Sequence, residues 1–321
     1  MGYSFNNGFN INELNSTVAY WMDGYKKQMQ IIVEKRLPQS VKIRAEWDEL
    51  LGNNDSKINN STNKAKAFTG VQSPQNGVAG SVLPLIKTVW DQNAYDYINY
   101  PSTTSGISGS YNGYCPMSYV SYPQRTLTGC VATAMAQIMK FWNYPARGNG
   151  YHSYTPSNKD FGTQVVDFST TAYQWNLMPD SLTLNSTAAQ TNAVATLMYH
   201  CGVAVNMDYR LSSGAGSIAT MYGAYPSAQY ALMNNFGYSN VVYYTRTGNF
   251  TDPQWINLLE TEISAGRPVM YDGHDTAKSY GHCFVADGYD ANNYIHFNWG
   301  WSGYCNGYFQ INALNPGLGG K

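Results

Sequence analysis

The chain has 321 residues, of which 43% are hydrophobic and only 12% are charged. The charged share is about half of the usual ~25%, which argues against an intrinsically disordered chain or a coiled coil. The 19 Lys and Arg residues nearly balance the 20 Asp and Glu residues, the net charge is −1, and no long basic cluster occurs. The composition therefore gives no support to a nucleic-acid-binding function, which would need a basic surface to bind the phosphate backbone.

Long apolar segments are absent from the sequence. The longest runs, such as residues 268–271 and 283–286, fall far short of the ~20 residues that a membrane-spanning helix needs. Residues 1–7 show neither the basic start nor the apolar stretch of a secretory signal peptide. The 28 tyrosines and the many Asn, Ser and Thr residues favour a protein outside the cytoplasm. We therefore expect a secreted, cell-surface or periplasmic protein whose signal peptide is not present in this chain.

The first predicted element is a helix that begins at Leu14 and ends before Pro38, because apolar residues recur there at spacings of three and four. The Asn-rich stretch that follows cannot bury enough apolar area to offset its ordering entropy. We therefore expect a small N-terminal segment (residues 1–52), a linker that proteases can reach (53–80) and a larger body (81–321).

The body begins with predicted helices and ends with predicted strands. Apolar residues at helical spacings predict three helices, one that begins at Cys130 and ends before Pro145, and two at about residues 187–201 and 251–265. Gly202 is expected to stop the second helix, and residues 203–209 alternate as a strand would. Four short strands are predicted last, at residues 268–271, 282–287, 294–299 and 308–311. Helices followed by an antiparallel sheet indicate an α+β body.

The cysteines and histidines narrow the possible chemistry. Five cysteines are too few for a disulfide framework, and their odd number leaves at least one thiol without an intrachain partner. The sequence contains no C-x-x-C pair and no H-x-x-x-H pair, so we expect no structural zinc site. The unpaired thiol is therefore the residue of interest.

Cys130 is predicted to occupy the first position of a helix, directly after Thr128 and Gly129. Unpaired backbone N–H groups and the helix macrodipole favour an anion such as a thiolate at that position. The same N–H groups can stabilise the oxyanion of a tetrahedral intermediate. A small buried cysteine at a helix start is an equally good interpretation of the position alone.

A thiolate nucleophile needs a base, and His282, at the start of a predicted strand, is the candidate. Asn298 or Trp299, at the end of the next predicted strand, is placed to orient the imidazole and to shield its hydrogen bond from water. Gln124, six residues before Cys130, is placed to donate a hydrogen bond to an oxyanion, although a surface-loop glutamine explains it equally well. The remaining histidines are expected to be structural: His152, His200, His274 and His296.

Several segments carry these residues in a specific order. They are TGCVATAMAQIMK (128–140), VNMDY (205–209) with SSG (212–214), GHCFVADG (281–288), and NWGW (298–301) followed by GYF (307–309) and ALNP (313–316). Together they resemble the C10 family of cysteine peptidases, the streptopain and interpain group, which have a papain-like fold. The resemblance covers nearly all of residues 80–316.

The resemblance implies that Cys130 is the nucleophile and His282 its partner, while Trp299 takes the place beside the imidazole that an Asn holds in papain itself. It also implies a substrate cleft lined by Tyr209, Ser212, Ser213, Gly214, Gly281 and Trp301. The N-terminal segment would then be a propeptide that keeps the zymogen inactive until it is cut away, which fits the linker predicted above.

Three features depart from the family pattern. Cys283 stands where the family usually has Ala, and on a strand its side chain should point away from His282. Asp272 stands where the streptopain type carries a Gln, and a carboxylate there is expected to alter substrate preference or to oppose an oxyanion. The chain also begins inside a propeptide-like segment and ends before the family's glycine-rich loop and last strand.

We therefore predict a cysteine endopeptidase zymogen that hydrolyses peptide bonds through an acyl-enzyme, with a reduced thiol but without a metal or organic cofactor. Its expected partners are protein or peptide substrates and its own propeptide, and we expect a monomer. One alternative is a cell-wall amidase of the Cys-His type, against which the NWGW motif and the propeptide-like segment argue. The other is an inactive or inhibitory binding protein whose N-terminal segment stays docked in the cleft.

Overall fold

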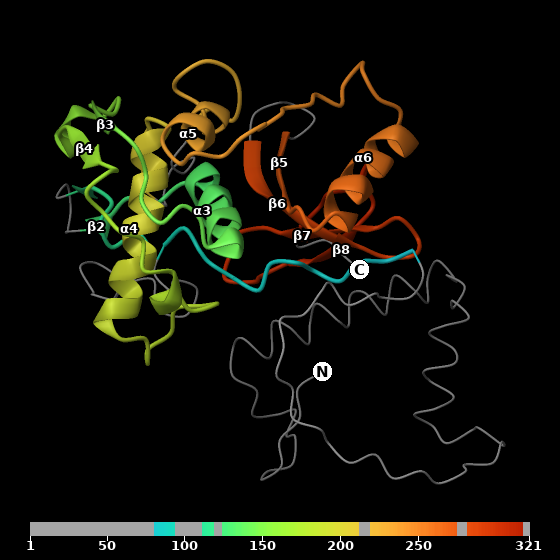
Figure 1. Cartoon of the computed structure of the whole chain (residues 1–321), viewed down its shortest axis with the longest axis horizontal. Coiled ribbons are helices and arrows are strands. Elements are labelled where there is room, and N and C mark those ends of the chain that lie inside the picture. The colour runs from blue at the N-terminus through green and yellow to red at the C-terminus, as the bar shows by residue number, and fades with distance from the viewer. Residues whose placement is uncertain (1–79, 94–110, 119–123, 212–218, 275–280, 317–321) are drawn as a thin grey trace, which may run out of the picture. The chain divides into compact units, whose positions relative to one another are not determined.

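The computed structural model describes residues 80–93, 111–118, 124–211, 219–274 and 281–316. Helices dominate the first part of these ranges, and a four-stranded antiparallel sheet forms the last part (Figure 1). The α+β arrangement predicted from the sequence is thereby confirmed. The predicted N-terminal segment (1–52) and all but the last residue of the predicted linker (53–80) lie outside the described residues.

Helix α3 (Cys130–Trp142) packs against two further helices, α4 (Ala188–Ala204) and α5 (Ala228–Asn234), and against the sheet. Every side chain from Val131 to Met139 is buried, which explains why this stretch is apolar on almost all sides. Gly129 precedes the helix with a φ of 88°, a conformation that glycine adopts without steric cost.

Helix α4 runs further than its sequence predicts. The expected stop at Gly202 and the expected strand at residues 203–209 are wrong, since α4 continues to Ala204 and no strand follows it. A Cβ at position 202 would collide with the hydroxyl of Tyr209, whose ring packs back onto the helix. Gly202 therefore permits a close approach and does not end the helix.

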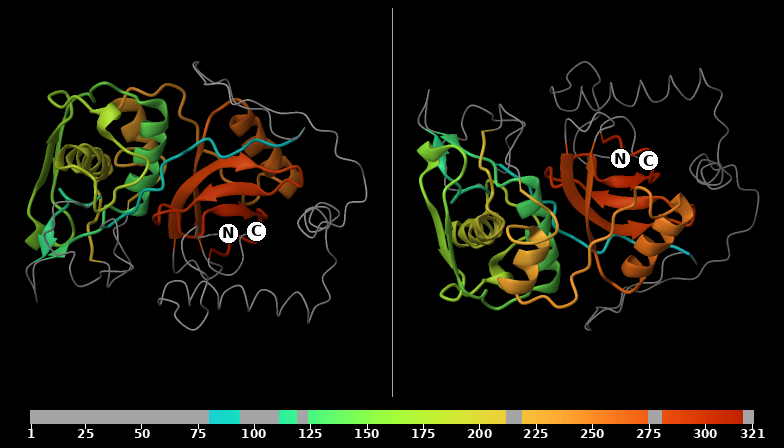
Figure 2. Two further views of the ribbon diagram at one scale, coloured as in Figure 1. Left: turned by 90° about the horizontal axis from the view of Figure 1, so that it is seen from below. Right: turned by 90° about the horizontal axis from the view of Figure 1, so that it is seen from above.

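The last part of the chain forms one sheet whose strands are adjacent in chain order and antiparallel: β5 (Val269–His274), β6 (Gly281–Tyr289), β7 (Ile295–Asn298) and β8 (Gly307–Phe309). Alternate residues of β6 face opposite sides of the sheet. Cys283 and Val285 belong to the core that includes α3, whereas Phe284 and Ala286 belong to the core that includes α6 (Asp252–Ser264). The sheet therefore lies between α3 and α6 (Figure 2).

Short elements that the sequence analysis did not predict complete the helical part. They are the strand pairs β1 (Met117–Ser118) with β2 (Gln124–Arg125) and β3 (Tyr151–Tyr154) with β4 (Gln164–Asp167), and the 3-10 helices η2 (Lys159–Phe161) and η3 (Trp175–Leu177). Strands this short carry too few alternating residues to be recognised in a sequence.

Residues 80–93 tie the sheet to the helical part. Val82 and Tyr289 exchange two backbone hydrogen bonds of 2.9 Å at the sheet, and the Val89 N–H donates to the Asp180 carbonyl at 2.8 Å. The segment is drawn in cyan in Figure 1. This segment, called the strap below, is hydrogen-bonded to both the helical part and the sheet.

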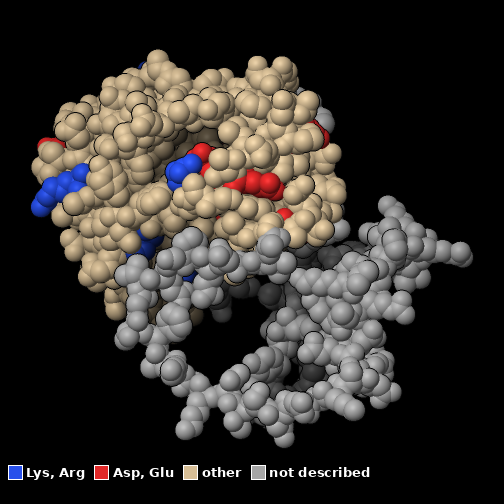
Figure 3. All heavy atoms as spheres, turned by 45° about the vertical axis from the view of Figure 1, so that its right-hand side comes forward, with Lys and Arg blue, Asp and Glu red and all other residues tan. Residues whose placement is uncertain are grey.

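Uncharged residues form most of the described face in Figure 3, in line with the sparse charge of the sequence. Tyrosine is the commonest of the exposed large hydrophobic side chains. Across the part of the chain that the structure describes, we find no helix with the length and apolar character of a membrane span.

Candidate active site

The turn before α3 fixes Cys130 at the first position of the helix. The hydroxyl oxygens of Thr128 and Thr133 lie 3.0 Å apart, and the Thr133 hydroxyl also donates to the Gly129 carbonyl at 3.0 Å. The Thr128 N–H donates to the Gln92 carbonyl at 2.9 Å. Because these bonds join groups on both sides of the turn, the position of Cys130 is set by well-packed backbone.

The Cys130 sulfur contacts backbone N–H groups from two elements. Those of Cys130 and Val131 belong to the open end of α3, and that of Cys283 belongs to β6. Each of these N–H groups favours a negative charge at the sulfur. Since His282 directly precedes Cys283, the same contact brings the predicted nucleophile and the predicted base close together.

Burial is the largest influence on the pKa values of both Cys130 and His282. Burial raises the pKa of the Cys130 thiol and outweighs the N–H groups, which lower it. Burial also lowers the pKa of His282, and the hydrogen bond to Trp299 opposes that shift. The thiolate expected from the helix end alone is therefore not favoured, because burial penalises its charge. A thiolate at this position requires a compensating cation, and a protonated His282 would supply it.

His282 is the second residue of β6 and lies opposite Gly273 of β5. Its Nε2 atom is 2.8 Å from the backbone carbonyl oxygen of Trp299. A carbonyl oxygen can only accept a hydrogen bond, so Nε2 carries the hydrogen and donates it. In the neutral imidazole this leaves Nδ1 without a proton, available to take one from a thiol.

Aromatic rings enclose the imidazole. The ring of Trp301 stacks on that of His282 with a centroid distance of 4.7 Å, and the rings of Phe284 and Trp299 follow at 5.7 and 6.2 Å. The Trp299 side chain is only 3% exposed. Trp299 thus combines a packed ring with a backbone carbonyl that accepts a hydrogen bond from His282.

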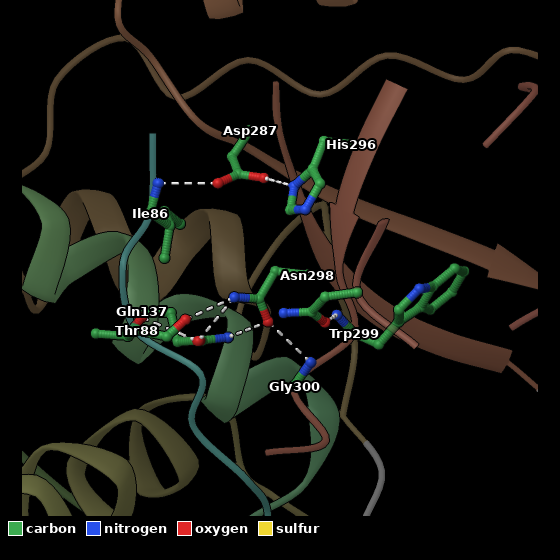
Figure 4. A network of polar contacts seen from close by, with 9 residues as sticks. Ile86, Thr88, Gln137, Asp287, His296, Asn298, Trp299 and Gly300 are labelled. Carbon is green, nitrogen blue, oxygen red and sulfur yellow. Dashed lines mark hydrogen bonds and ion pairs between the residues drawn. The ribbon is translucent and has the colours of Figure 1, made fainter. Parts of the chain in front are cut away.

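The side chain of Asn298 orients the backbone and does not orient the imidazole, contrary to one reading of the sequence. Its nitrogen donates to the Thr88 carbonyl at 2.7 Å, and its oxygen accepts from the Gly300 N–H at 3.1 Å. The side-chain amides of Asn298 and Gln137 also face each other, and the nitrogen of each lies 3.3 Å from the oxygen of the other. Figure 4 shows this network. Asn298 and Gly300 directly precede and follow Trp299, so the network fixes the backbone on both sides of that residue.

Gln137 is a residue of this site that the sequence analysis missed. Its carbonyl oxygen accepts from the Thr88 hydroxyl at 2.9 Å and from the Trp90 N–H at 3.2 Å, and its side chain is 1% exposed. Through this amide, the helix that begins at Cys130 is bonded to Asn298, the residue before Trp299. An amide within an otherwise apolar helix was the available signal, because a buried amide needs partners.

Among the residues predicted to line a cleft, Tyr209 is wrong. Its side chain is 1% exposed and packs against Gly202, so no substrate can reach it. Trp301 is partly buried on the imidazole, and Gly281 is exposed at the start of β6. A Cβ at Gly281 would lie 2.8 Å from the His274 ring, which explains the glycine there.

Four further predicted residues are not placed by the structure. Ser212, Ser213 and Gly214 lie outside the described residues, and so does the side chain of Gln124, whose backbone belongs to β2. Their assignment to the cleft or to an oxyanion site stays a prediction.

Three of the other histidines have the hydrogen-bond partners expected of structural residues. His152 Nε2 lies 2.6 Å from the Asn206 side-chain oxygen, His200 Nδ1 lies 2.9 Å from the Tyr173 hydroxyl, and His296 Nδ1 lies 2.6 Å from the Asp287 carboxylate. Asp287 also accepts from the N–H of Ile86, on the strap formed by residues 80–93, as Figure 4 shows.

Comparison with known sequences gives a consistent result. The model of the Peptidase C10 family matches residues 106–309. Streptopain of Streptococcus pyogenes serotype M1 is 34% identical over 252 residues, which cover 76% of this chain and 61% of streptopain. Thiol protease/hemagglutinin PrtT of Porphyromonas gingivalis is 26% identical over 325 residues, which cover 99% of this chain and 32% of PrtT. The chain therefore spans less than two thirds of the length of these curated relatives.

Two solved structures share the fold. Active interpain A, a cysteine protease of Prevotella intermedia, superimposes with a TM-score of 0.64 at 36% identity and covers 75% of this chain and 90% of its own. A mutant fragment of prointerpain A from the same organism gives a TM-score of 0.61 at 31% identity, covering 94% of this chain and 78% of its own. The papain-like α+β fold class predicted from the sequence is confirmed by these matches.

Proposed function

The chain belongs to the peptidase C10 family, and from this membership we propose that it is a cysteine endopeptidase made as a zymogen. The observation that carries the proposal is the hydrogen bond of His282 to the Trp299 carbonyl. It fixes a tautomer whose other nitrogen is available to a thiol, next to a cysteine at a helix start.

In the proposed reaction, the Cys130 thiol gives its proton to Nδ1 of His282, and the sulfur attacks the carbonyl carbon of a peptide bond. The N–H groups at the start of α3 support an oxyanion, with Gln124 as a further donor. His282 then protonates the leaving amine, and an acyl-enzyme remains on Cys130. Water that gives a proton to His282 attacks the acyl group, which releases the new carboxyl end and restores the thiol.

The surrounding residues have assigned tasks in this proposal. The Trp299 carbonyl orients the imidazole, and Asn298 and Gln137 hold that carbonyl in place through the backbone. Trp301 covers the imidazole and, with Gly281, borders the substrate beside the reacting groups. Ser212, Ser213 and Gly214 are proposed to complete this border.

Latency is the second part of the proposal. Residues 1–52 would form the propeptide, residues 53–80 the linker that is cut, and residues 81–321 the catalytic domain. In support, the match to prointerpain A covers 94% of this chain, whereas the match to active interpain A covers 75%. We further propose a monomer that acts on proteins or peptides in a secreted, cell-surface or periplasmic location.

The test is casein hydrolysis by the full chain with and without reductant, alongside Cys130→Ala. Hydrolysis that requires both the reductant and Cys130, together with a new N-terminus within residues 53–80 by peptide mapping, supports the proposal. Cleavage of muropeptides in place of casein would identify a cell-wall amidase. Absence of both activities would indicate an inactive or inhibitory binding protein.

A further inference from the structure

Asp272 and Cys283 lie directly opposite each other on β5 and β6. Opposite residues of an antiparallel pair point to the same face of the sheet. Cys283 packs in the core that includes the helix of Cys130, so Asp272 also faces that side. The carboxylate therefore lies on the side of the sheet that meets the nucleophile.

Among the described residues, the only basic group that interacts with the charge of Asp272 is the His274 imidazole, which lowers the pKa of the carboxyl. The groups that interact with its charge are the thiols of Cys130 and Cys283, the hydroxyls of Tyr243 and Tyr271, and the imidazole of His274. Over the described ranges, no Lys or Arg side chain forms an ion pair with Asp272. The described arginine pairs serve other carboxylates: Arg210 with Asp208, Arg246 with Asp252, and Arg267 with Glu262.

A partly buried carboxylate without a Lys or Arg partner is unfavourable, and at Asp272 the His274 imidazole does not outweigh the effect of burial. Asp272 is partly exposed, and burial is the largest cause that raises its pKa. Its charge also raises the pKa of the Cys130 thiol. A cation bound at Asp272 would oppose both effects, since it would compensate the carboxylate and weaken the field that disfavours the thiolate.

We propose that Asp272 determines substrate specificity by binding the basic side chain of an Arg or Lys residue close to the scissile bond. The inference rests on the proposed peptidase function. Arginine fits best, because its guanidinium can donate two parallel hydrogen bonds to one carboxylate. Since the bound cation also favours the Cys130 thiolate, a basic substrate gains in kcat as well as in KM.

The test uses the reduced full chain after maturation. Digestion of a peptide mixture first locates the position at which Arg or Lys is enriched around the cleaved bonds. Two peptides that differ only there, by Arg or by its uncharged analogue citrulline, are then compared. For the wild type we expect kcat/KM to be at least ~10-fold higher with Arg, as the loss of a charge-assisted hydrogen bond implies.

Variants separate the carboxylate from the rest of the site. Asp272→Asn should reduce the Arg-to-citrulline ratio to about one, and Asp272→Glu should retain most of it. Asp167→Asn, which removes an exposed carboxylate of β4, is the matched control and should keep the wild-type ratio. A wild-type ratio near one, or a ratio that survives Asp272→Asn, overturns the inference while cleavage of both peptides still supports the proposed function. If the reduced wild type cleaves no peptide, the proposed function fails and this inference fails with it.

Discussion

A backbone atom of Trp299 orients the imidazole of His282, because Nε2 donates to the Trp299 carbonyl oxygen at 2.8 Å. The Trp299 side chain has a different task, since its ring packs on Phe284 and Phe309 at centroid distances of 4.3 and 5.3 Å. Its ring N–H has no hydrogen-bond partner among the residues that the structure describes. Substitution can therefore remove the ring and leave the orienting carbonyl in place.

This separation predicts unequal effects of two variants. His282→Ala should lower kcat/KM at least ~10²-fold, because the general acid and base is lost. Trp299→Phe should lower it less than ~10-fold and should cost less than ~3 kcal/mol of unfolding free energy, because only part of a packed ring is removed. Peptide hydrolysis and urea unfolding measure the two quantities. Equal losses of activity would show that the indole ring itself takes part.

The raised pKa of Cys130 leads to a prediction about alkylation. Since burial opposes the thiolate, its formation at mildly acidic pH depends on proton transfer to His282. Iodoacetamide should therefore modify Cys130 ahead of the other four cysteines. In His282→Ala the modification should slow at least ~10-fold and move to more alkaline pH. Mass spectrometry of the labelled peptides measures both rates.

Cys305 provides the internal comparison for this labelling, because it is partly exposed as Cys130 is, whereas Cys115, Cys201 and Cys283 are buried. Labelling of Cys130 and Cys305 at equal rates, unchanged by His282→Ala, would contradict an activated thiolate.

The amide pair of Gln137 and Asn298 predicts a coupled loss of stability. Asn298→Ala leaves the Thr88 carbonyl and the Gly300 N–H without their bonds to this side chain, in a buried place. We expect the free energy of unfolding to fall by about 2–6 kcal/mol, since each of the two unsatisfied groups costs about 1–3 kcal/mol. Urea unfolding in a Cys130→Ala background measures the change without self-digestion.

A double-mutant cycle tests the pairing itself. Gln137→Met and Asn298→Leu should interact by at least ~1 kcal/mol, because once one amide is removed the other has already lost its partner. Asn292→Ala, in the exposed turn before β7, is the control and should change stability by less than ~0.5 kcal/mol. Additive effects of the two amide substitutions would show that they do not act as a unit.

The parts of the site that could be predicted are those specified by local sequence. Helical spacing from Val131 to Trp142 placed Cys130 at a helix start, and alternation in residues 282–287 placed His282 at the start of a strand. Both features depend on residues within one or two turns or one strand. The structure places them as predicted.

The missed features depend on contacts between distant residues. Gln137 bonds to Thr88, 49 positions away, and to Asn298, 161 positions away, so its role is set only by the folded chain. The sequence predicts a helix stop at Gly202 because the approach of the Tyr209 ring to this glycine arises only in the folded chain. The thiol pKa was expected to be low for the same reason: a helix start is visible in a sequence, but the water excluded around it is not.

His200 of α4 gives the fold a pH dependence that is separate from the active site. Burial lowers the pKa of this histidine from 6.5 to about 4. It is 7% exposed, its Nδ1 lies 2.9 Å from the Tyr173 hydroxyl, and the Phe168 ring packs edge-on against it. A second proton on the imidazole would place a charge among these groups, which explains the direction of the shift.

The folded chain becomes less stable as the pH falls, because His200 binds a proton more readily in the unfolded chain than in the folded one. Between pH 6.5 and about 4, His200 takes up a proton in the unfolded chain and stays neutral in the folded one, so acidification favours unfolding. The difference between the pKa values of His200 in the unfolded and the folded chain corresponds to about 3 kcal/mol of unfolding free energy, most of which is lost by pH 4. His200→Gln cannot titrate and can still accept from Tyr173. In a Cys130→Ala background, we expect the unfolding free energy of the wild type to fall below that of His200→Gln by an amount that grows as the pH decreases from 7 to 4. Parallel stability curves for the two proteins would mean that His200 is protonated equally in both states, and the burial that explains its low pKa would then be refuted.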